Sequence, residues 1–194
     1  MQGGKMKNLV VAFLTIVLLF GCAATANKQL HIPASEGNLY KVKAEIEGGK
    51  DVDSKDAAGQ TALMYASEKG RLEVVKYLVE NGADVNVRSN RGLTSLIWAS
   101  FANRTDVMEY LLEHGANVNA TTPFNETALF YAAAQGHLKA VKLLLEKNAD
   151  IKIKNKKGQT AIAVALELNR SEIARFLYEK ITHQNELSKK ILSD

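Results

Sequence analysis

The chain has 194 residues, and its 25 lysines and arginines nearly balance 21 aspartates and glutamates. Because no long basic run or arginine–aromatic stripe accompanies this balance, we do not expect a nucleic acid partner. The single cysteine excludes a disulfide framework, so packing must stabilise the fold.

The first 21 residues differ in composition from the rest of the chain. Two lysines precede an uncharged, mainly apolar run from Leu9 to Phe20, and small residues follow it. This run is shorter than the roughly 20 apolar residues that a membrane-spanning helix needs. A basic start, a short apolar run and small residues are typical of a secretory signal peptide. We therefore assign residues 1–21 to a signal peptide that starts at Met1 or Met6.

The only cysteine, Cys22, directly follows this run in the sequence Leu19-Phe20-Gly21-Cys22. The segment resembles a bacterial lipobox, although Phe20 is an unusual occupant. The resemblance implies cleavage before Cys22, lipidation of its thiol and a lipidated tether over residues 22–27. Because Ala23 follows the cysteine, it also implies a periplasm-facing outer-membrane lipoprotein. The alternative is cleavage after Ala24-Thr25-Ala26, which would give a soluble periplasmic or secreted protein.

From about residue 28 onward the sequence repeats with a period of 33 residues. The most regular positions are occupied by four threonines and four leucines: Thr61, Thr94, Thr127 and Thr160, and Leu78, Leu111, Leu144 and Leu177. Within one period, Thr61 suits the N-cap of a first helix that ends at Gly70. Apolar residues at helical spacing from Leu72 to Val79 predict a second helix. A period of this length indicates stacked helix-turn-helix units.

The motif that joins these units is Gly-Ala-Asp-Val-Asn at residues 82–86, which recurs at 115–119 and, in a weaker form, at 148–152. Together with the Gly-x-Thr-x-Leu at the first helix, it resembles the ankyrin repeat. A partial copy begins at Gly37. The resemblance implies an all-α solenoid of about five repeats, caps included, over residues 28–181. Residues 182–194 would then be a C-terminal tail or a helix extension.

Some positions depart from the repeat in an informative way. Three asparagines, which also match glycosylation sequons, occupy turns where other repeats have glycine, and we interpret them as turn residues: Asn103, Asn125 and Asn169. In the first cap, Pro33 predicts a first helix that is short or begins at that residue. Glu45 replaces a core leucine there, as suits a cap that faces water.

Signals for catalysis and metal binding are missing from the sequence. None of the four histidines has metal-ligand spacing to another. The sequence also contains no nucleophile elbow and no phosphate-binding glycine loop. We therefore expect no enzyme activity and no cofactor.

One aromatic residue recurs at the same position of three neighbouring repeats: Tyr65, Trp98 and Tyr131. In the ankyrin pattern this position faces between the helices and is usually apolar. We therefore expect these rings in the core rather than in a ligand-stacking ladder.

The resemblance implies a concave face built from the turn before each first helix and the last residues of that helix. The candidate partner-binding residues on it are Gln60, Glu68, Lys69, Arg88, Asn90, Arg91, Leu93, Phe101, Phe124, Glu126 and Gln135. Leu93, Phe101 and Phe124 are bulky apolar residues at positions expected to be exposed. With their charged neighbours they form a predicted hot spot for protein binding. The alternative is that Phe124 packs down on its own repeat.

These observations predict a non-catalytic protein–protein interaction module, anchored in the bacterial cell envelope. Its concave face would bind a partner protein, whose identity the sequence leaves unknown. We expect a monomer that contacts the membrane through its lipid only. Two other roles stay open: an inhibitor or immunity protein for a secreted toxin or envelope enzyme, and a secreted effector that acts in another cell.

Overall fold

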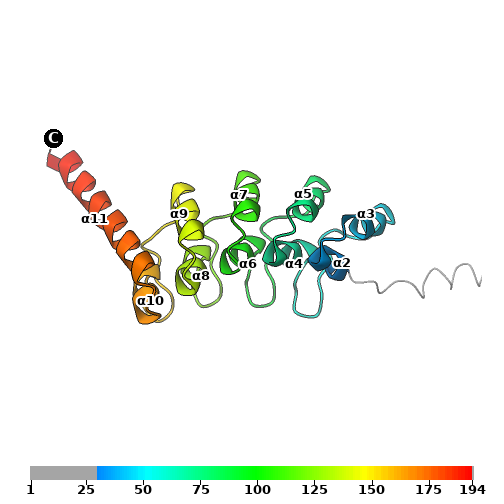
Figure 1. Ribbon diagram of the computed structural model, residues 1–194, viewed down its shortest axis with the longest axis horizontal. Coiled ribbons are helices and arrows are strands. Elements are labelled where there is room, and N and C mark those ends of the chain that lie inside the picture. The colour runs from blue at the N-terminus through cyan, green and yellow to red at the C-terminus, as the bar shows by residue number, and fades with distance from the viewer. Residues whose placement is uncertain (1–29, 194) are drawn as a thin grey trace, which may run out of the picture.

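The computed structural model describes residues 30–193, which form ten helices arranged in five pairs, here numbered repeats 1 to 5 (Figure 1). The inner row contains α2 (His31–Glu36), α4 (Ala62–Lys69), α6 (Ser95–Phe101), α8 (Ala128–Gln135) and α10 (Ala161–Glu167). The outer row contains α3 (Leu39–Glu47), α5 (Leu72–Glu80), α7 (Thr105–Glu113), α9 (Leu138–Glu146) and α11 (Ser171–Ser193). Each inner helix packs on its outer partner and on the next inner helix. The predicted all-α solenoid of five repeats is confirmed.

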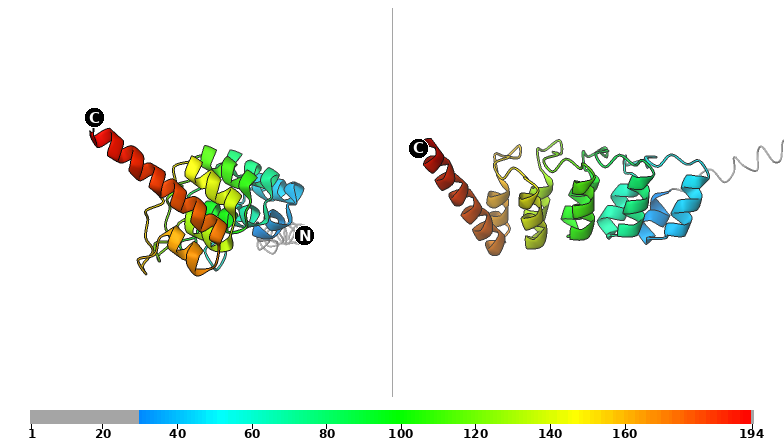
Figure 2. Two further views of the ribbon diagram at one scale, coloured as in Figure 1. Left: turned by 60° about the vertical axis from the view of Figure 1, so that its left-hand side comes forward. Right: turned by 90° about the horizontal axis from the view of Figure 1, so that it is seen from above.

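The loops between repeats project beyond the inner helices, all in the same direction (Figures 1 and 2). We call each loop a finger and number it by the repeat that it precedes. Fingers 2 to 5 are residues 51–60, 84–93, 117–126 and 150–159. Together with the inner helices, they form the concave face.

Threonines begin the inner helices, as the sequence predicts. The Oγ1 of Thr61 accepts a hydrogen bond from the Met64 N–H at 3.4 Å, and Thr94 makes the same bond with Ile97 at 3.3 Å. Thr127 and Thr160 have the same extended backbone at the N-cap, but their side chains make no capping bond. The cap position is therefore shared by all four repeats, whereas the hydrogen bond is not.

Residues with a left-handed backbone conformation lie at helix ends and in turns, at equivalent positions of the repeats. The three asparagines interpreted as turn residues all have positive φ: Asn103 at 56°, Asn125 at 61° and Asn169 at 58°. Asparagine tolerates this conformation better than other residues with a side chain, so it can replace glycine there. This prediction is confirmed.

The core runs through all five repeats as one continuous cluster. The four leucines that mark the period in the outer helices are completely buried: Leu78, Leu111, Leu144 and Leu177. Small residues at one inner-helix position let neighbouring repeats approach closely and are also completely buried: Ala66, Ala99, Ala132 and Ala165.

The two ends of the stack differ. At the first end, α2 is only six residues long, as Pro33 predicts, although it begins two residues before that proline. Glu45 is half-buried there and forms an ion pair with Lys50 at 3.5 Å. At the other end, Leu166 is 62% exposed, because no sixth repeat covers it. The equivalent residue of repeat 4, Ala133, is completely buried.

The last helix, α11, continues without interruption through residues 182–193 and projects from the stack (Figure 1). No helix in the described part of the chain is long and apolar enough to span a membrane. The expected signal peptide, Cys22 and the tether over residues 22–27 lie outside the described residues.

Candidate functional site

The fingers are joined to one another by hydrogen bonds. The N–H of Asn90 in finger 3 donates to the Ala58 oxygen in finger 2 at 3.0 Å. Arg88 donates through Nη1 to the main-chain oxygen of Thr121 in finger 4. The N–H of Lys156 in finger 5 donates to the main-chain oxygen of Phe124 at 2.9 Å. These bonds hold the finger tips in a fixed row, so little ordering entropy would be lost on binding.

Each finger also closes on its own turn residue, which is Asp56 in finger 2. The N–H groups of Ala58 and Gln60 donate to Asp56 Oδ1 at 2.9 and 2.8 Å, and the Tyr65 hydroxyl donates to its Oδ2 at 2.8 Å. Although burial acts in the opposite direction, the Gln60, Tyr65 and Ala58 hydrogen bonds lower the pKa of Asp56. This carboxylate therefore stabilises the turn and is already fully engaged.

The aromatic column is partly buried: Tyr65, Trp98 and Tyr131 are half-buried, and Trp98 and Tyr131 pack against the core cluster, as expected. Their polar atoms reach toward the fingers. The Tyr131 hydroxyl donates to Glu126 Oε2 at 3.1 Å, in the way that Tyr65 bonds to Asp56. The buried Nε1 of Trp98 has no hydrogen-bond acceptor among the described residues. In repeat 3, Leu93 occupies the place of Glu126, so no side-chain acceptor stands there.

Two of the three apolar residues of the predicted hot spot are exposed as expected, and the third is not. Phe124 is 64% exposed and Phe101 is 38% exposed, but Leu93 is buried, with 7% of its surface accessible. Leu93 immediately precedes the N-cap of α6, and its N–H donates to Ser89 Oγ at 3.2 Å. This bond holds Leu93 at the base of finger 3, beneath finger 4. Phe124 stands out from the finger tips and does not pack down on its own repeat.

A hollow of about 560 Å³ lies between fingers 3 and 4. Arg91, Leu93, Phe124, Glu126 and Tyr131 are among the residues that line it. A second hollow of about 190 Å³ continues the concave face toward repeat 5 and is lined in part by Lys157 and Leu168. Glu126 and Tyr131 line both hollows, so their hydrogen-bonded pair separates them.

Three aromatic rings connect the inner helices beside these hollows. Phe101 meets Trp98 edge-to-face at 6.1 Å between ring centroids, and it meets Tyr131 at 6.5 Å. Burial, and next the Glu126 carboxylate, raise the pKa of Tyr131 to about 12. Tyr131 is therefore a neutral hydrogen-bond donor under ordinary conditions.

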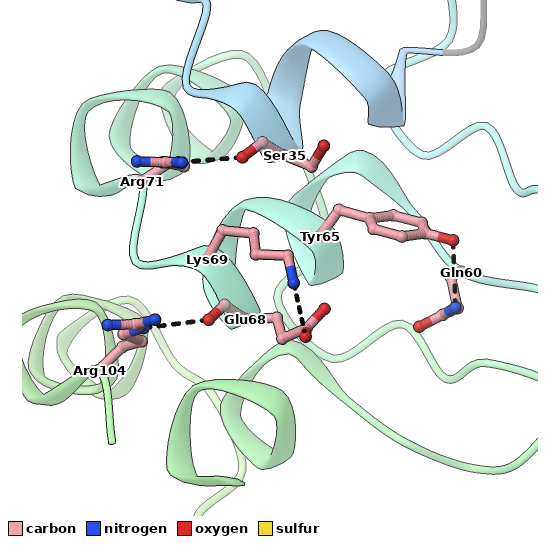
Figure 3. Close-up of polar contacts among 7 residues, drawn as sticks. All are labelled: Ser35, Gln60, Tyr65, Glu68, Lys69, Arg71 and Arg104. Carbon is pink, nitrogen blue, oxygen red and sulfur yellow. Dashed lines mark hydrogen bonds and ion pairs between the residues drawn. The ribbon is translucent and has the colours of Figure 1, made fainter. Parts of the chain in front are cut away.

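The candidate residues of repeat 2 are bonded among themselves (Figure 3). Lys69 and Glu68 form an ion pair at 3.0 Å, and Gln60 Nε2 donates to the Tyr65 hydroxyl at 3.3 Å. By contrast, Arg91 in repeat 3 forms no ion pair within the described structure. Exposed Gln135 at the end of α8 likewise makes no side-chain hydrogen bond there. The unengaged polar groups of the candidate set therefore lie in repeats 3 and 4.

Sequence reasoning missed a second series of contacts between repeats. In repeats 2 to 5, a basic side chain at the start of the outer helix donates to a main-chain oxygen near the end of the inner helix of the preceding repeat. The four pairs are Arg71 with Ser35, Arg104 with Glu68, His137 with Phe101 and Arg170 with Ala134, at 3.0 to 3.1 Å. Figure 3 shows the first two. The signal was present in the sequence, because the four basic residues follow the same period of 33.

Comparison with known proteins agrees with this geometry. A family model described as ankyrin repeats (3 copies) matches residues 30–122 and 120–188. The comparison with curated proteins finds no match. Ankyrin repeats are generally protein–protein interaction modules, and proteins built from them are typically non-catalytic. Because this match spans most of the chain and the structure has five stacked helix pairs, the chain belongs to the ankyrin-repeat family.

Proposed function

We propose that this chain is a non-catalytic binding module of the bacterial cell envelope, and that its concave face binds one partner protein. The observation that carries the proposal is the exposure of Phe124 above a hollow on a row of hydrogen-bonded fingers. An exposed aromatic ring beside a pocket is the usual form of a binding hot spot. Bonds between the fingers support rigid recognition, because the surface does not have to be ordered by its partner.

The envelope part of the proposal rests on the sequence alone. The apolar run and the lipobox-like segment at Cys22 support export and lipidation, and Ala23 supports a periplasm-facing position at the outer membrane. Mass spectrometry of the mature N-terminus tests this directly. A diacylglyceryl group on Cys22 would support anchoring. A free N-terminus at Asn27 would instead support a soluble periplasmic protein or a secreted effector.

A tagged pull-down from solubilised membranes tests the binding part. The wild-type chain would be compared with Phe101→Ala and Phe124→Ala, which alter exposed rings of the concave face. Tyr40→Ala is the matched control, because Tyr40 is 83% exposed on the outer helix α3. We expect the partner to be captured by the wild type and the control and to bind both concave variants roughly tenfold more weakly. Equal capture by all four proteins would contradict the proposal.

The same experiment separates a scaffold from an inhibitor. If the captured partner is an enzyme or toxin, its activity would be measured with increasing amounts of the purified chain. Loss of activity at stoichiometric binding would identify an inhibitor or immunity protein. Unchanged activity would support a scaffold.

A further inference from the structure

The fingers of repeats 3 to 5 carry basic side chains that form no ion pair with any other described residue. We propose that the partner presents an acidic segment with one bulky apolar side chain. This inference rests on the proposed function, in which the concave face binds a partner protein. The apolar side chain occupies the hollow beside Phe124, and carboxylates on either side of it bind the basic residues of fingers 3 and 5.

The first argument is an imbalance between acids and bases on the concave face. The carboxylates of the fingers, with Glu68 and Glu167 beside them, already accept hydrogen bonds or form an ion pair. Asp56 and Glu126 bond to tyrosines, Glu68 pairs with Lys69, and Glu167 accepts from Gln159. The remaining finger carboxylates accept from main-chain N–H groups: Asp51, Asp53, Asp84 and Asp150. The exposed bases of fingers 3 and 5 form no ion pair within the described residues: Arg88, Arg91, Lys152, Lys154, Lys156 and Lys157. Bases therefore outnumber carboxylates in fingers 3 to 5, and this part of the face attracts carboxylates.

The second argument is the position of the hollow relative to these charges. Arg91 lines the 560 Å³ hollow, and Lys157 lines the smaller hollow that continues from it. The exposed ring of Phe124 and the buried side chain of Leu93 line the same hollow as Arg91. The hollow lies within the range of about 300–1,000 Å³ that ligand pockets span. A segment laid across the fingers would place an apolar side chain there and acidic groups at both ends.

The third argument distinguishes a protein segment from nucleic acid. Glu126 stands between Arg91 and Lys157 and lines both hollows, so a continuous row of phosphates would meet a carboxylate at its centre. An acidic peptide avoids this repulsion, because its apolar residue can lie at that point. In repeat 2 the position of Arg91 is occupied by Ala58, and the base of finger 2, Lys55, donates to the Arg88 main-chain oxygen. The acidic segment therefore binds across repeats 3 to 5 and not along the whole stack.

Selection from a phage-displayed library of random peptides on the immobilised full chain tests this inference. We expect enriched peptides to carry aspartate or glutamate on both sides of one leucine, phenylalanine or tryptophan. Their affinity should fall as salt is added, because exposed charges are screened. A neutral or basic consensus, or no enrichment at all, would overturn the inference.

Charge-reversal variants then locate the site. Arg91→Glu, Lys157→Glu and Phe124→Ala should each weaken the best acidic peptide roughly tenfold or more, because like charges or a lost anchor replace the contacts. The control is the double variant Lys41→Glu/Lys139→Glu, which reverses two exposed charges on outer helices and should bind normally. Circular dichroism would verify that every variant is folded. Loss of binding in the control, or none in the finger variants, would contradict the site.

Two further probes set the inference apart from simpler explanations. A peptide with the same acidic residues but alanine in place of its apolar residue should bind at least several-fold more weakly; equal binding would overturn the role of the hollow. A single-stranded RNA that binds more tightly than the acidic peptide would overturn the choice of partner. A selected motif of other composition that still needs Phe124 would overturn this inference alone. If Phe101→Ala and Phe124→Ala capture the natural partner as well as the wild type does, the proposed function itself would be overturned.

Discussion

The Nε of Arg104 donates a hydrogen bond of 3.1 Å to the main-chain oxygen of Glu68, in the preceding repeat (Figure 3). Glu68 lies near the end of α4, where main-chain oxygens lack partners within the helix. A cation there also interacts favourably with the helix dipole. The side chain of Arg104 thus holds repeat 3 to repeat 2 at a point where no apolar side chain could do so.

Arg104→Ala should therefore destabilise the stack. We expect the free energy of unfolding to fall by about 1.5 kcal/mol, because Arg104 is exposed and hydrogen bonds that involve a charged group contribute about 1.5–3 kcal/mol. Urea unfolding followed by the fluorescence of Trp98, the only tryptophan, measures this change. Arg175→Ala is the control, because Arg175 is exposed and makes no hydrogen bond in the described structure. Its effect should remain within about 0.5 kcal/mol; equal effects would contradict the role of the contact.

Gly70 leaves space for the Arg104 side chain. Gly70→Ala should therefore lower the free energy of unfolding more than Gly82→Ala does. Gly70 has φ of +69°, and an added Cβ would lie 2.8 Å from Arg104 Cδ. Gly82 has φ of +89° but nothing within 4 Å of an added Cβ. Gly82→Ala should cost about 1–2 kcal/mol from the left-handed backbone alone, and Gly70→Ala should cost more.

A double variant separates the two causes. In Gly70→Ala/Arg104→Ala the crowding disappears, so the combined loss should be smaller than the sum of the single losses. Urea unfolding of the four proteins gives this comparison. Strict additivity would show that the arginine does not crowd the new methyl group.

The repeat architecture could be predicted because its markers are local. A threonine N-cap or a left-handed glycine depends on its own turn, so the period of 33 and the positive φ of Asn103 could both be inferred. The burial of Leu93 could not, because it depends on how the next finger lies over it. The basic contacts between repeats are visible in the sequence only through their donors, which recur every 33 residues. Their acceptors are main-chain oxygens, which place no constraint on the residue type at Ser35, Glu68, Phe101 or Ala134.

The Tyr131–Glu126 pair predicts a loss of stability in alkali. Burial, and next the Glu126 carboxylate, raise the pKa of Tyr131 to about 12 in the folded chain, against about 10 for an unfolded tyrosine. The neutral phenol is thus the form that the fold favours. Its contribution is complete below pH 10 and is lost as the pH rises from about 10 through 12. Tyr131→Phe should therefore lose less stability over this interval than the wild type does.

Absorbance titration of tyrosinate gives an independent measurement. The difference between wild type and Tyr131→Phe should show one ionisation near pH 12. Glu126→Gln should lower that pKa but leave it above 10, because burial is the largest cause of the shift. A difference titration centred near pH 10 would contradict the buried, hydrogen-bonded phenol.

One of the four basic contacts departs from the others, and it gives the last prediction. Where an arginine donates, the residue opposite is glycine, and an added Cβ would lie 2.9 Å from Arg71 Cδ, 2.8 Å from Arg104 Cδ or 3.2 Å from Arg170 Cδ. Where the residue opposite is Asn103, which already has a Cβ, the donor is the shorter His137. The two differences compensate each other, because the Cβ of Asn103 occupies the space that an arginine would need.

His137→Arg alone should therefore bring no gain in stability, and Asn103→Gly alone should have little effect, since glycine also adopts the left-handed conformation. Together, Asn103→Gly/His137→Arg should recreate the glycine–arginine pair and be at least as stable as the wild type. The coupling between the two changes should lie within about 0.5–3 kcal/mol, the range for residues in contact. Urea unfolding of the cycle measures it. At the contact between repeats 4 and 5, the reverse change, Gly136→Asn, should destabilise the chain by crowding Arg170. Zero coupling in the cycle, together with unchanged stability of Gly136→Asn, would refute the compensation.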